Sequence, residues 1–387
     1  MMIRRIILAA MFSALAALCG FNGVALAQSS APSSSGAAWS FAVSGDSRNC
    51  GDVVMPGIAA GVKQSGASFY WHLGDFRAIY NFDEDMQHQP LYIAKPLTIS
   101  QYMSVAWDDF IENQIVPFGT TPVFLGIGNH DAVPPKTREQ FLIQFADWLD
   151  QPGLQKQRLD DAYFDWLNEG NSPQPPRDYF SHRTSKMNTY FHWSKSGVDF
   201  ISLDNATPDQ FDSPQMTWFE NVLRLDLANP QIHTIVVAMH EALPDSISEN
   251  HAMDQFTAGI ESGRRVYADL LKAQNEAHKR VYVLASHSHY FMDGIFNTRY
   301  WREHGGVLPG WIIGTAGAVR YTLPPEKVDA KAAATNVYGF LLGTVQPTGE
   351  INFTFHQLNE SDVPPAVIET YKPEFVHWCF AENSVAH

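Results

Sequence analysis

Residues that bind metal ions in many proteins recur at the ends of apolar runs in this sequence. In chain order they are Asp46 in GDSR, Asp75 in LGDF, Asn129, His130 and Asp131 in GNHD, His240 in AMHEA, and His287 and His289 in SHSH. Carboxylate and amide oxygens combined with imidazole nitrogens suit iron, manganese or zinc. A carboxylate shared by two such ions about 3.5 to 4 Å apart generates a hydroxide for in-line attack at phosphorus. The residue types therefore predict a two-metal hydrolytic site.

Each of these residues also has a structural explanation when it is taken alone. Asp46 and Asp75 would cap helices that follow their strands, and Asn129 would hold a left-handed turn. His240 would be a buried core histidine with its hydrogen bonds satisfied. Their joint order and their position at strand ends favour a site instead, because loops at the ends of neighbouring strands converge in space.

The elements that would position these residues are strands alternating with helices, which predicts a layered α/β architecture. The candidate strands lie within residues 39–46, 67–75, 121–131, 189–205, 233–242, 280–290 and 310–318. After Ala318, the stretch YGFLLGTVQPTGEINFTFHQL has the alternation and turn signals of closing antiparallel strands.

Helices are predicted between several of these strands. Their apolar faces are formed by Met103, Trp107, Phe110 and Ile111, by Phe141, Leu142, Phe145, Trp148 and Leu149, and by Phe219, Val222 and Leu223. Thr137 and Gln140 form a capping box for the second helix. Ser213 followed by Pro214 predicts the N-cap and first turn of the third, which would stop near Asn229.

The ordered set of motifs resembles the calcineurin-like metallophosphoesterase superfamily, which includes purple acid phosphatases and many phosphodiesterases. The resemblance runs from about residue 40 to 318, and YFHWSKSGVDFISLDN and SPQMTWFENVL are also similar to typical family segments. A single block is weak evidence, whereas GNHD with an upstream LGD and a downstream SHSH is specific. The resemblance implies a two-sheet β-sandwich flanked by helices.

The resemblance also implies a role for each site residue. It assigns Asp46 and His289 to a first metal ion, Asp75 to a bridge between two ions, and Asn129, His240 and His287 to the second ion. His130 would face the leaving group as the general acid, with Asp131 orienting its ring. The implied cofactors are two divalent or trivalent ions of iron, manganese or zinc.

This sequence departs from the family pattern at three positions. Arg48 stands where the first motif often has a metal-binding His, and Ser286 stands where Gly usually introduces the final pair. Ala78 stands where purple acid phosphatases place a Tyr. Arg48 cannot bind a cation, since a guanidinium has no acceptor. It would instead grip the substrate phosphate as a bidentate donor.

The loss of the first-motif His leaves several arrangements open for the first ion. Water or Asn49 would complete its shell. Alternatively, the first site is weak and fills only when substrate is present.

The N-terminus has the features of an export signal. Arg4 and Arg5 precede an apolar segment, and Ala25-Leu26-Ala27 has the small-x-small pattern of a cleavage site, so residues 1–27 are predicted to be a signal peptide. Residues 28–38 then form a Ser-rich linker. The alternative is an uncleaved membrane anchor, since the segment is nearly long enough to span a bilayer. We expect a periplasmic or extracellular protein without stable membrane insertion after cleavage.

Charge and cysteine content limit the partners. The net charge of −15 becomes about −17 without the two signal-peptide arginines, which opposes binding to nucleic acid and anionic membranes and favours a small substrate. The 45% hydrophobic fraction supplies a core and excludes wholesale disorder. Cys50 and Cys379 remain after cleavage, and they form either a disulfide or two unpaired buried thiols.

A main domain over residues 39–345 is predicted, with residues 346–387 as C-terminal strands and a tail packing on it. Residues 136–178 hold helical patterns and a Pro-rich stretch without a strand, so they are predicted to be a mainly helical insertion or lid. The expected function is that of an exported phosphoesterase acting on a small phosphate ester through a metal-bridging hydroxide. A phosphodiesterase on cyclic nucleotides or phospholipid head groups, and a non-catalytic metal- or phosphate-binding protein, are the alternatives.

Overall fold

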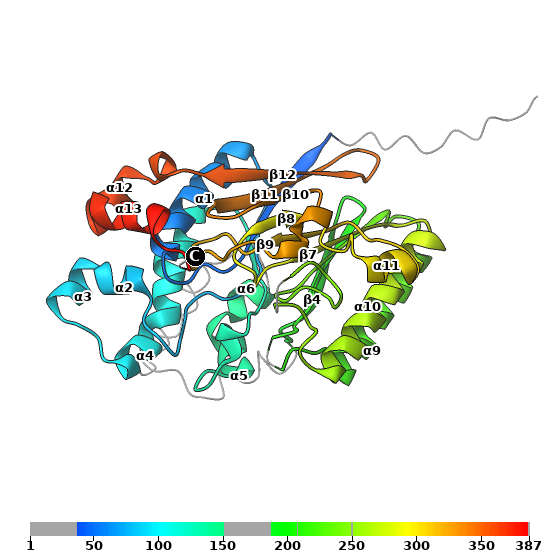
Figure 1. Ribbon diagram of the computed structural model, residues 1–387, viewed down its shortest axis with the longest axis horizontal. Helices are drawn as coiled ribbons and strands as arrows, with labels where there is room; N and C mark the ends of the chain where they lie inside the picture. Colours follow the sequence, from blue (N-terminus) through cyan, green and yellow to red (C-terminus); the bar gives the residue numbers. More distant parts are fainter. Residues whose placement is uncertain (1–36, 151–186, 207, 249–250, 386–387) are drawn as a thin grey trace, which may run out of the picture. The chain divides into compact units, whose positions relative to one another are not determined.

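Two β-sheets face each other in the computed structural model, which describes residues 37–150, 187–206, 208–248 and 251–385 (Figure 1). One sheet has five strands in the order β12-β11-β1-β2-β3, and the other has seven in the order β10-β8-β9-β7-β6-β5-β4. The strands are β1 (Trp39–Ser44), β2 (Tyr70–His72), β3 (Val123–Leu125), β4 (Phe191–Lys195), β5 (Val198–Ser202), β6 (Thr234–Ala238), β7 (Arg280–Ala285), β8 (Phe291–Asp293), β9 (Gly310–Ile313), β10 (Ala332–Ala334), β11 (Tyr338–Val345) and β12 (Ile351–Leu358).

The apolar side chains between the two sheets form one core. Phe41 of β1, Trp71 of β2 and Phe200 of β5 are fully buried there. Ala42 and Tyr70, which alternate with them along β1 and β2, belong to a second core that helices cover. This division follows from the two-residue period of a strand, which sends successive side chains to opposite faces.

Helices cover the outer faces of both sheets (Figure 1). On the five-stranded side lie α1 (Gly51–Ser65), α4 (Ile99–Phe110), α5 (Arg138–Gln144), α6 (Ala146–Asp150), α12 (Pro365–Tyr371) and α13 (Pro373–Ala381), with the shorter α2 (Glu84–His88) and α3 (Pro90–Ala94) nearby. On the seven-stranded side lie α9 (Ser213–Ala228), α10 (Thr257–Asn275) and α11 (Arg299–Glu303). Short helical turns are η1 (Ile111–Ile115), η2 (Val116–Phe118), η3 (His130–Ala132), η4 (Pro325–Asp329) and η5 (Glu360–Asp362).

Most predicted elements are present with small changes. The segment 189–205 is a hairpin of β4 and β5, and β11 pairs with β12 in antiparallel register. The capping box of Thr137 and Gln140 is present on α5. The predicted N-cap Ser213 is wrong by one residue, because the side chain of Asp212 accepts the hydrogen bond from the amide of Gln215. The short strands β8 and β10 were not predicted.

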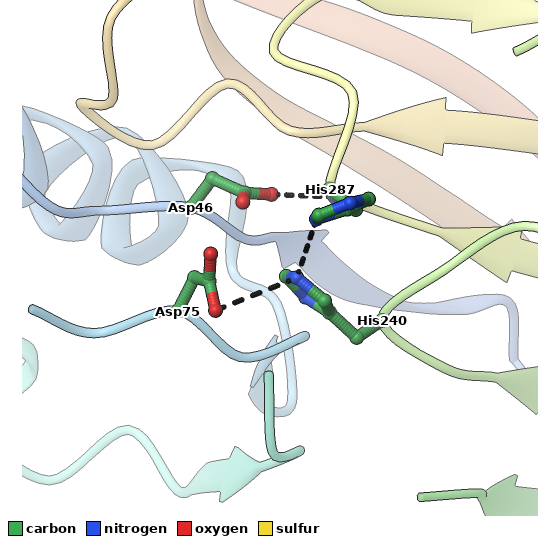
Figure 2. A group of neighbouring side chains, drawn as sticks. All are labelled: Asp46, Asp75, His240 and His287. Carbon is green, nitrogen blue, oxygen red and sulfur yellow. Dashed lines mark hydrogen bonds and ion pairs between the residues drawn. The ribbon is translucent and has the colours of Figure 1, made fainter. Parts of the chain in front are cut away.

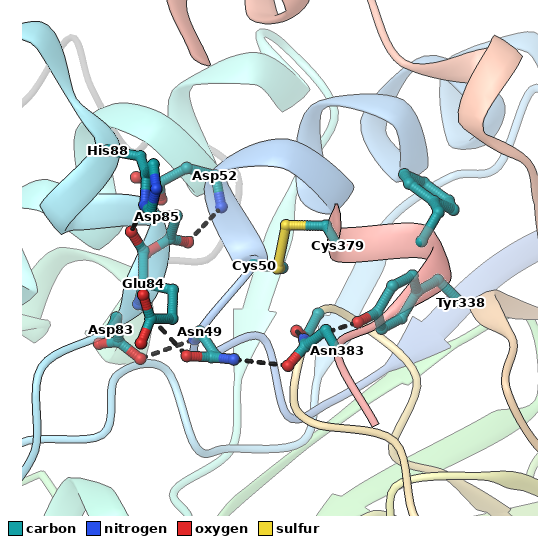
Figure 3. The surroundings of a disulfide bond; sticks show 12 residues. Asn49, Cys50, Asp52, Asp83, Glu84, Asp85, His88, Tyr338, Cys379 and Asn383 are labelled. Carbon is teal, nitrogen blue, oxygen red and sulfur yellow. Dashed lines mark hydrogen bonds between the residues drawn. A yellow bond between two sulfur atoms is a disulfide. The ribbon is translucent and has the colours of Figure 1, made fainter. Parts of the chain in front are cut away.

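Cys50 and Cys379 form a disulfide, with an S–S distance of 2.07 Å (Figure 3). The bond joins the residue before α1 to α13, although 329 positions separate the two cysteines. Of the two alternatives left open by the sequence, the disulfide is therefore the one present. It fastens the C-terminal helices beside the start of the domain.

Several predictions concern residues outside the described part of the chain. These include the signal peptide at 1–27, most of the linker at 28–38, and the predicted insertion beyond α6. Within the described residues, no helix is both long and apolar enough to cross a membrane.

Candidate metal centre

The predicted site residues meet where parallel strands of both sheets end. Strands β1, β2 and β3 run parallel, as do β5, β6, β7 and β9, so their carboxyl ends share an edge within each sheet. A backbone hydrogen bond joins the two edges, because the amide of Gly45 after β1 donates to the carbonyl of Ile313 on β9 across 3.0 Å. Within the five-stranded sheet, the amide of Asp46 donates to the carbonyl of Gly74, also at 3.0 Å.

Three buried side chains and one partly exposed histidine, His287, form the centre of the site. Asp46, Asp75, His240 and His287 each offer one ligand atom, and these atoms lie within 4.8 Å of one another (Figure 2). Asn129 joins them, because its Oδ1 lies 2.9 Å from His240 Nε2. The four loops that supply these side chains are far apart in the sequence. Their convergence is the arrangement that a single metal ion requires.

Three imidazoles of the site are oriented by backbone carbonyls. The Nδ1 atoms donate in the pairs His240 with Leu73 at 2.9 Å, His130 with Ala78 at 2.8 Å and His289 with Val319 at 2.6 Å. A carbonyl only accepts, so Nδ1 carries the proton and Nε2 faces the interior of the site. This tautomer presents Nε2 as a metal ligand or proton carrier.

The two central carboxylates are ionised in spite of their burial. Burial raises their pKa values, but His240 and His289 bring the pKa of Asp46 below its usual range. His240 and His130 lower that of Asp75 in the same way. Asp46 Oδ1 and Asp75 Oδ2 have no hydrogen-bond partner within the described part of the chain. Burying a charged oxygen without a partner costs free energy, so these two oxygens are suited to bind a cation.

The pKa of His240 is raised, whereas the pKa values of His130, His287 and His289 are lowered. Burial lowers the pKa of His240, but Asp75 and Asp46 outweigh burial and raise the pKa to about 10. A cation bound here would compete with that proton, because metal binding displaces protons from its ligands. The donor set of two carboxylates, two imidazoles and an amide oxygen therefore fits an ion such as iron, manganese or zinc.

Backbone conformation at the site is unusual. Asp46, Asp75 and His287 have φ angles of 60°, 60° and 63°, in the left-handed region. Non-glycine residues adopt this region at a cost, and they do so preferentially at functional sites. Gly128 is required by packing, since a Cβ there would lie 2.3 Å from Asp75 Oδ1. The loops are shaped to bring the carboxylates and the GNHD segment together.

Arg48 points into the site beside this cluster. Its Nε lies 3.6 Å from Asp75 Oδ2, its Nη2 lies 3.2 Å from His289 Nε2, and its Nη1 contacts the ring of His130. Only 14% of the Arg48 side chain is exposed. His289 Nε2 in turn lies 3.2 Å from Asp46 Oδ1. The predicted contact of Arg48 with a substrate phosphate stays a prediction.

Asn49, proposed from the sequence to complete the shell of the first ion, is directed elsewhere. Its Nδ2 donates to Asn383 across 2.6 Å and its Oδ1 accepts from the amide of Glu84 (Figure 3). These two bonds use both ends of the side-chain amide. Of the two alternatives, water and Asn49, the structure therefore directs Asn49 away from the site.

The sequence predicted that Asp131 orients the ring of His130, but in the structure its carboxylate has other partners. Its carboxylate accepts hydrogen bonds from the amides of Asp75 at 2.7 Å, Gly128 at 2.9 Å and Phe76 at 3.1 Å. The ring is oriented by the Ala78 carbonyl instead. Asp131 therefore acts on the backbone of the loop that presents Asp75.

Several residues around the site were not identified as site residues from the sequence. Tyr80 stacks on His130 with ring centroids 4.8 Å apart, and Tyr321 stacks on His289 at 4.0 Å. Ser286 donates to Asp46 Oδ2, which gives a role to the Ser that replaces the usual Gly. The ring centroid of His251 lies 5.0 Å from that of His287. No motif marks the two tyrosines.

Comparisons with known proteins were made at the level of sequence and of structure. No protein-family model and no curated protein matches the sequence. The purple acid phosphatase PPD1 isolated from yellow lupin (Lupinus luteus) seeds has a similar structure, with a TM-score of 0.50 and 14% identity over 84% of this chain and 52% of that chain. PhoD has a TM-score of 0.48 and 13% identity over 84% of this chain and 70% of that chain.

The chain spans about half the length of the lupin phosphatase. At this low identity the likeness concerns the fold. It agrees with the two facing sheets flanked by helices that the sequence analysis expected. The chain therefore has the calcineurin-like metallophosphoesterase fold.

Proposed function

We propose that the protein is an exported, metal-dependent hydrolase of a small phosphate ester. The observation that carries the proposal is the set of four ligand atoms within 4.8 Å, from three buried residues and the partly exposed His287, delivered by loops from both sheets. The phosphatase whose fold is similar adds support. Export rests on the N-terminal signal features of the sequence.

One ion of iron, manganese or zinc would be held by five side chains, those of Asp46, Asp75, Asn129, His240 and His287. The ion would supply Lewis-acid polarisation of the phosphoryl oxygen and activation of a water molecule. The remaining ion of the predicted pair would depend on Asp46, Asp75 and His289.

His130 is the proposed general acid. Its Nδ1 is held by the Ala78 carbonyl, so Nε2 is the nitrogen that would give a proton to the departing alkoxide. Burial lowers the pKa of His130 against the opposing effect of Asp75, so its imidazolium is a stronger acid than that of free histidine. Only 3% of the surface of His130 is exposed, and this burial shields the proton from bulk water.

Asp75→Asn tests the metal dependence. The amide keeps the size of the side chain but removes the charge that a cation needs, so metal content and hydrolysis of an aryl phosphate monoester should both be lost. Metal analysis beside steady-state rates measures this. Asp108→Asn, on the exposed face of α4, is the matched control and should retain both. Normal activity in Asp75→Asn would end the proposal.

His130→Ala tests the proton donor. Turnover should fall by about 10² to 10⁴-fold while metal content stays unchanged, because the ring donates a proton and holds no ion. His192→Ala, which removes a partner of Asp199 on β4 and β5, should leave both unchanged. Assays on a bis-aryl diester beside the monoester would separate a phosphodiesterase from a monoesterase. Metal binding without any hydrolysis would instead favour the non-catalytic alternative.

A further inference from the structure

We propose that the guanidinium of Arg48 takes the place of one metal ion, so that the centre holds a single ion per chain. The inference rests on the proposed function, since it concerns the same site. It replaces the expectation of two ions by one ion and one fixed organic cation.

Arg48 lies among the groups that a second ion would need. The guanidinium is within 3.2 Å of His289 Nε2 and 3.6 Å of Asp75 Oδ2. Ligand atoms hold a metal such as zinc at about 2 Å. An ion bound by His289 and Asp75 would therefore fall in the space that the guanidinium fills.

The atoms around the guanidinium suit a hydrogen-bond donor. The Nδ1 proton of His289 is given to Val319, so its Nε2 lone pair is free to accept from Arg48. Asp75 Oδ2 has no hydrogen-bond partner among the described residues, and the guanidinium is the nearest cation to it. A guanidinium is always protonated and has no lone pair for a metal. It can neutralise these groups without leaving room for an ion.

The backbone holds Arg48 in this position. The amide of Ser47 donates to the carbonyl of Asp75 across 3.0 Å, and the amide of Asn49 donates to Asp83 across 2.6 Å. Both neighbours of Arg48 are therefore tied to the segment that follows β2. These bonds fix the backbone on both sides of Arg48. The side chain can therefore leave the site only by rotating toward the solvent, unless the bonds break.

Charge balance supports the same arrangement. Asp46 and Asp75 contribute two negative charges, which one divalent ion neutralises. Arg48 then leaves a positive surplus suited to a phosphate anion. A second divalent ion beside this guanidinium, which is only 14% exposed, would add like-charge repulsion with no further carboxylate to offset it. Asp46 and Asp75 are the only acidic members of the cluster within the described residues.

The test is the metal stoichiometry of the folded protein. Wild type loaded with excess manganese and then desalted should retain about one ion per chain, whereas Arg48→His should retain about two, because the imidazole supplies a ligand and vacates the guanidinium volume. Electron paramagnetic resonance of the manganese form gives a second readout. Wild type should show an isolated ion, and Arg48→His an exchange-coupled pair.

Controls separate charge from position. Arg264 lies on α10 and pairs with Asp245, away from the cluster, so Arg264→His should retain the wild-type stoichiometry. Arg48→Met removes the guanidinium without adding a ligand, and its second ion should bind more weakly than in Arg48→His. Thermal unfolding establishes that each variant is folded. If Arg48→His does not fold, the wild-type stoichiometry and spectrum decide alone.

The outcomes are distinct from those of the proposed function. Two ions in wild type, with or without added inorganic phosphate, would overturn the inference and leave the proposed function standing. The phosphate arm also tests whether a weak first site fills only when its anion is present. Absence of any retained ion in both wild type and Arg48→His would overturn the proposed function together with the inference.

Discussion

Arg77 and Arg48 both lie close to carboxylates, and their surroundings differ. Arg77 has no exposed surface, and it pairs with Asp52, Asp85 and Asp109, with Asp83 at 4.0 Å. Arg48 has one carboxylate oxygen at 3.6 Å and otherwise faces imidazoles. Arg77 is surrounded by carboxyl groups, whereas Asp46 Oδ1 and Asp75 Oδ2 near Arg48 have no hydrogen-bond partner among the described residues. The first environment is structural and the second suits a reaction centre.

The carboxylates of the two regions respond in opposite directions. Near Arg77, burial raises the pKa of Asp109 to about 7, and Asp52 adds to the effect while Arg77 opposes it. Burial likewise raises the pKa of Asp85. In the metal centre the imidazoles outweigh burial, and the pKa values of Asp46 and Asp75 are lowered. Burial therefore dominates at Asp85 and Asp109, whereas the imidazoles keep Asp46 and Asp75 ionised for a cation in the candidate metal centre.

The Arg77 network also connects helices. Asp52 lies on α1, Asp85 on α2 and Asp109 on α4, and the hydroxyl of Tyr371 on α12 donates to Asp52 across 2.8 Å. Cys50 precedes α1 in the same region (Figure 3). The network and the disulfide therefore fasten the same side of the domain.

Arg77→Met should lower the free energy of unfolding most, and far more than Arg48→Met does. Removing the cation leaves buried carboxylates unpaired, so the free energy of unfolding should fall by about 3 to 5 kcal/mol. Arg48→Met, measured with manganese supplied, should lose less than about 1 kcal/mol, because the ion still neutralises the centre. Urea unfolding followed by circular dichroism measures both. Equal losses in the two variants would contradict the assignment of a structural role to Arg77 alone.

Removal of the disulfide should have the next largest effect. Cys50→Ala combined with Cys379→Ala should lower the free energy of unfolding by about 2 to 4 kcal/mol, because the unfolded chain is no longer cross-linked. Metal content at a temperature where the variant is folded should be unchanged. Wild type reduced with dithiothreitol under denaturing conditions and refolded provides a second route to the same state. Loss of metal from the folded variant would mean that the two regions are coupled.

The smallest expected effect is the pH dependence due to Asp109. Its pKa in the folded state is about 7, above the ordinary 3.8, so the folded state holds the proton more tightly than the unfolded chain. The resulting stabilisation is complete below about pH 4 and is lost as the pH rises through about 7. Between about pH 5.5 and pH 8, wild type should lose on the order of 1 kcal/mol more stability than Asp109→Asn.

Unfolding in urea at several pH values measures this difference. Asp108→Asn, the exposed neighbour on α4, should keep the wild-type slope. Parallel stability curves for wild type and Asp109→Asn would show that Asp109 does not titrate in this range.

Much of the site was accessible from residue order. Strand ends are recognisable from alternation and apolar runs, and parallel strands of one sheet share an edge, so Asp46 and Asp75 could be predicted to meet. His240 follows β6 of the other sheet, and its place beside them was implied only by the family resemblance. Residues close in the chain were also predictable, as the Thr137 and Gln140 capping box shows. The sequence did not predict the partners of Asp131 or Asn49, since both side chains bind groups that packing alone brings near them.

The amino-acid sequence by itself determined the order of strands and helices, the ligand types and the export signal that we propose. The tertiary structure decided where each side chain points. Arg48 and His289 are 241 positions apart, yet their contact sets whether a second ion has room. Such contacts depend on how distant segments pack, and the hydrogen-bonding capacity of a residue does not specify which distant partner reaches it.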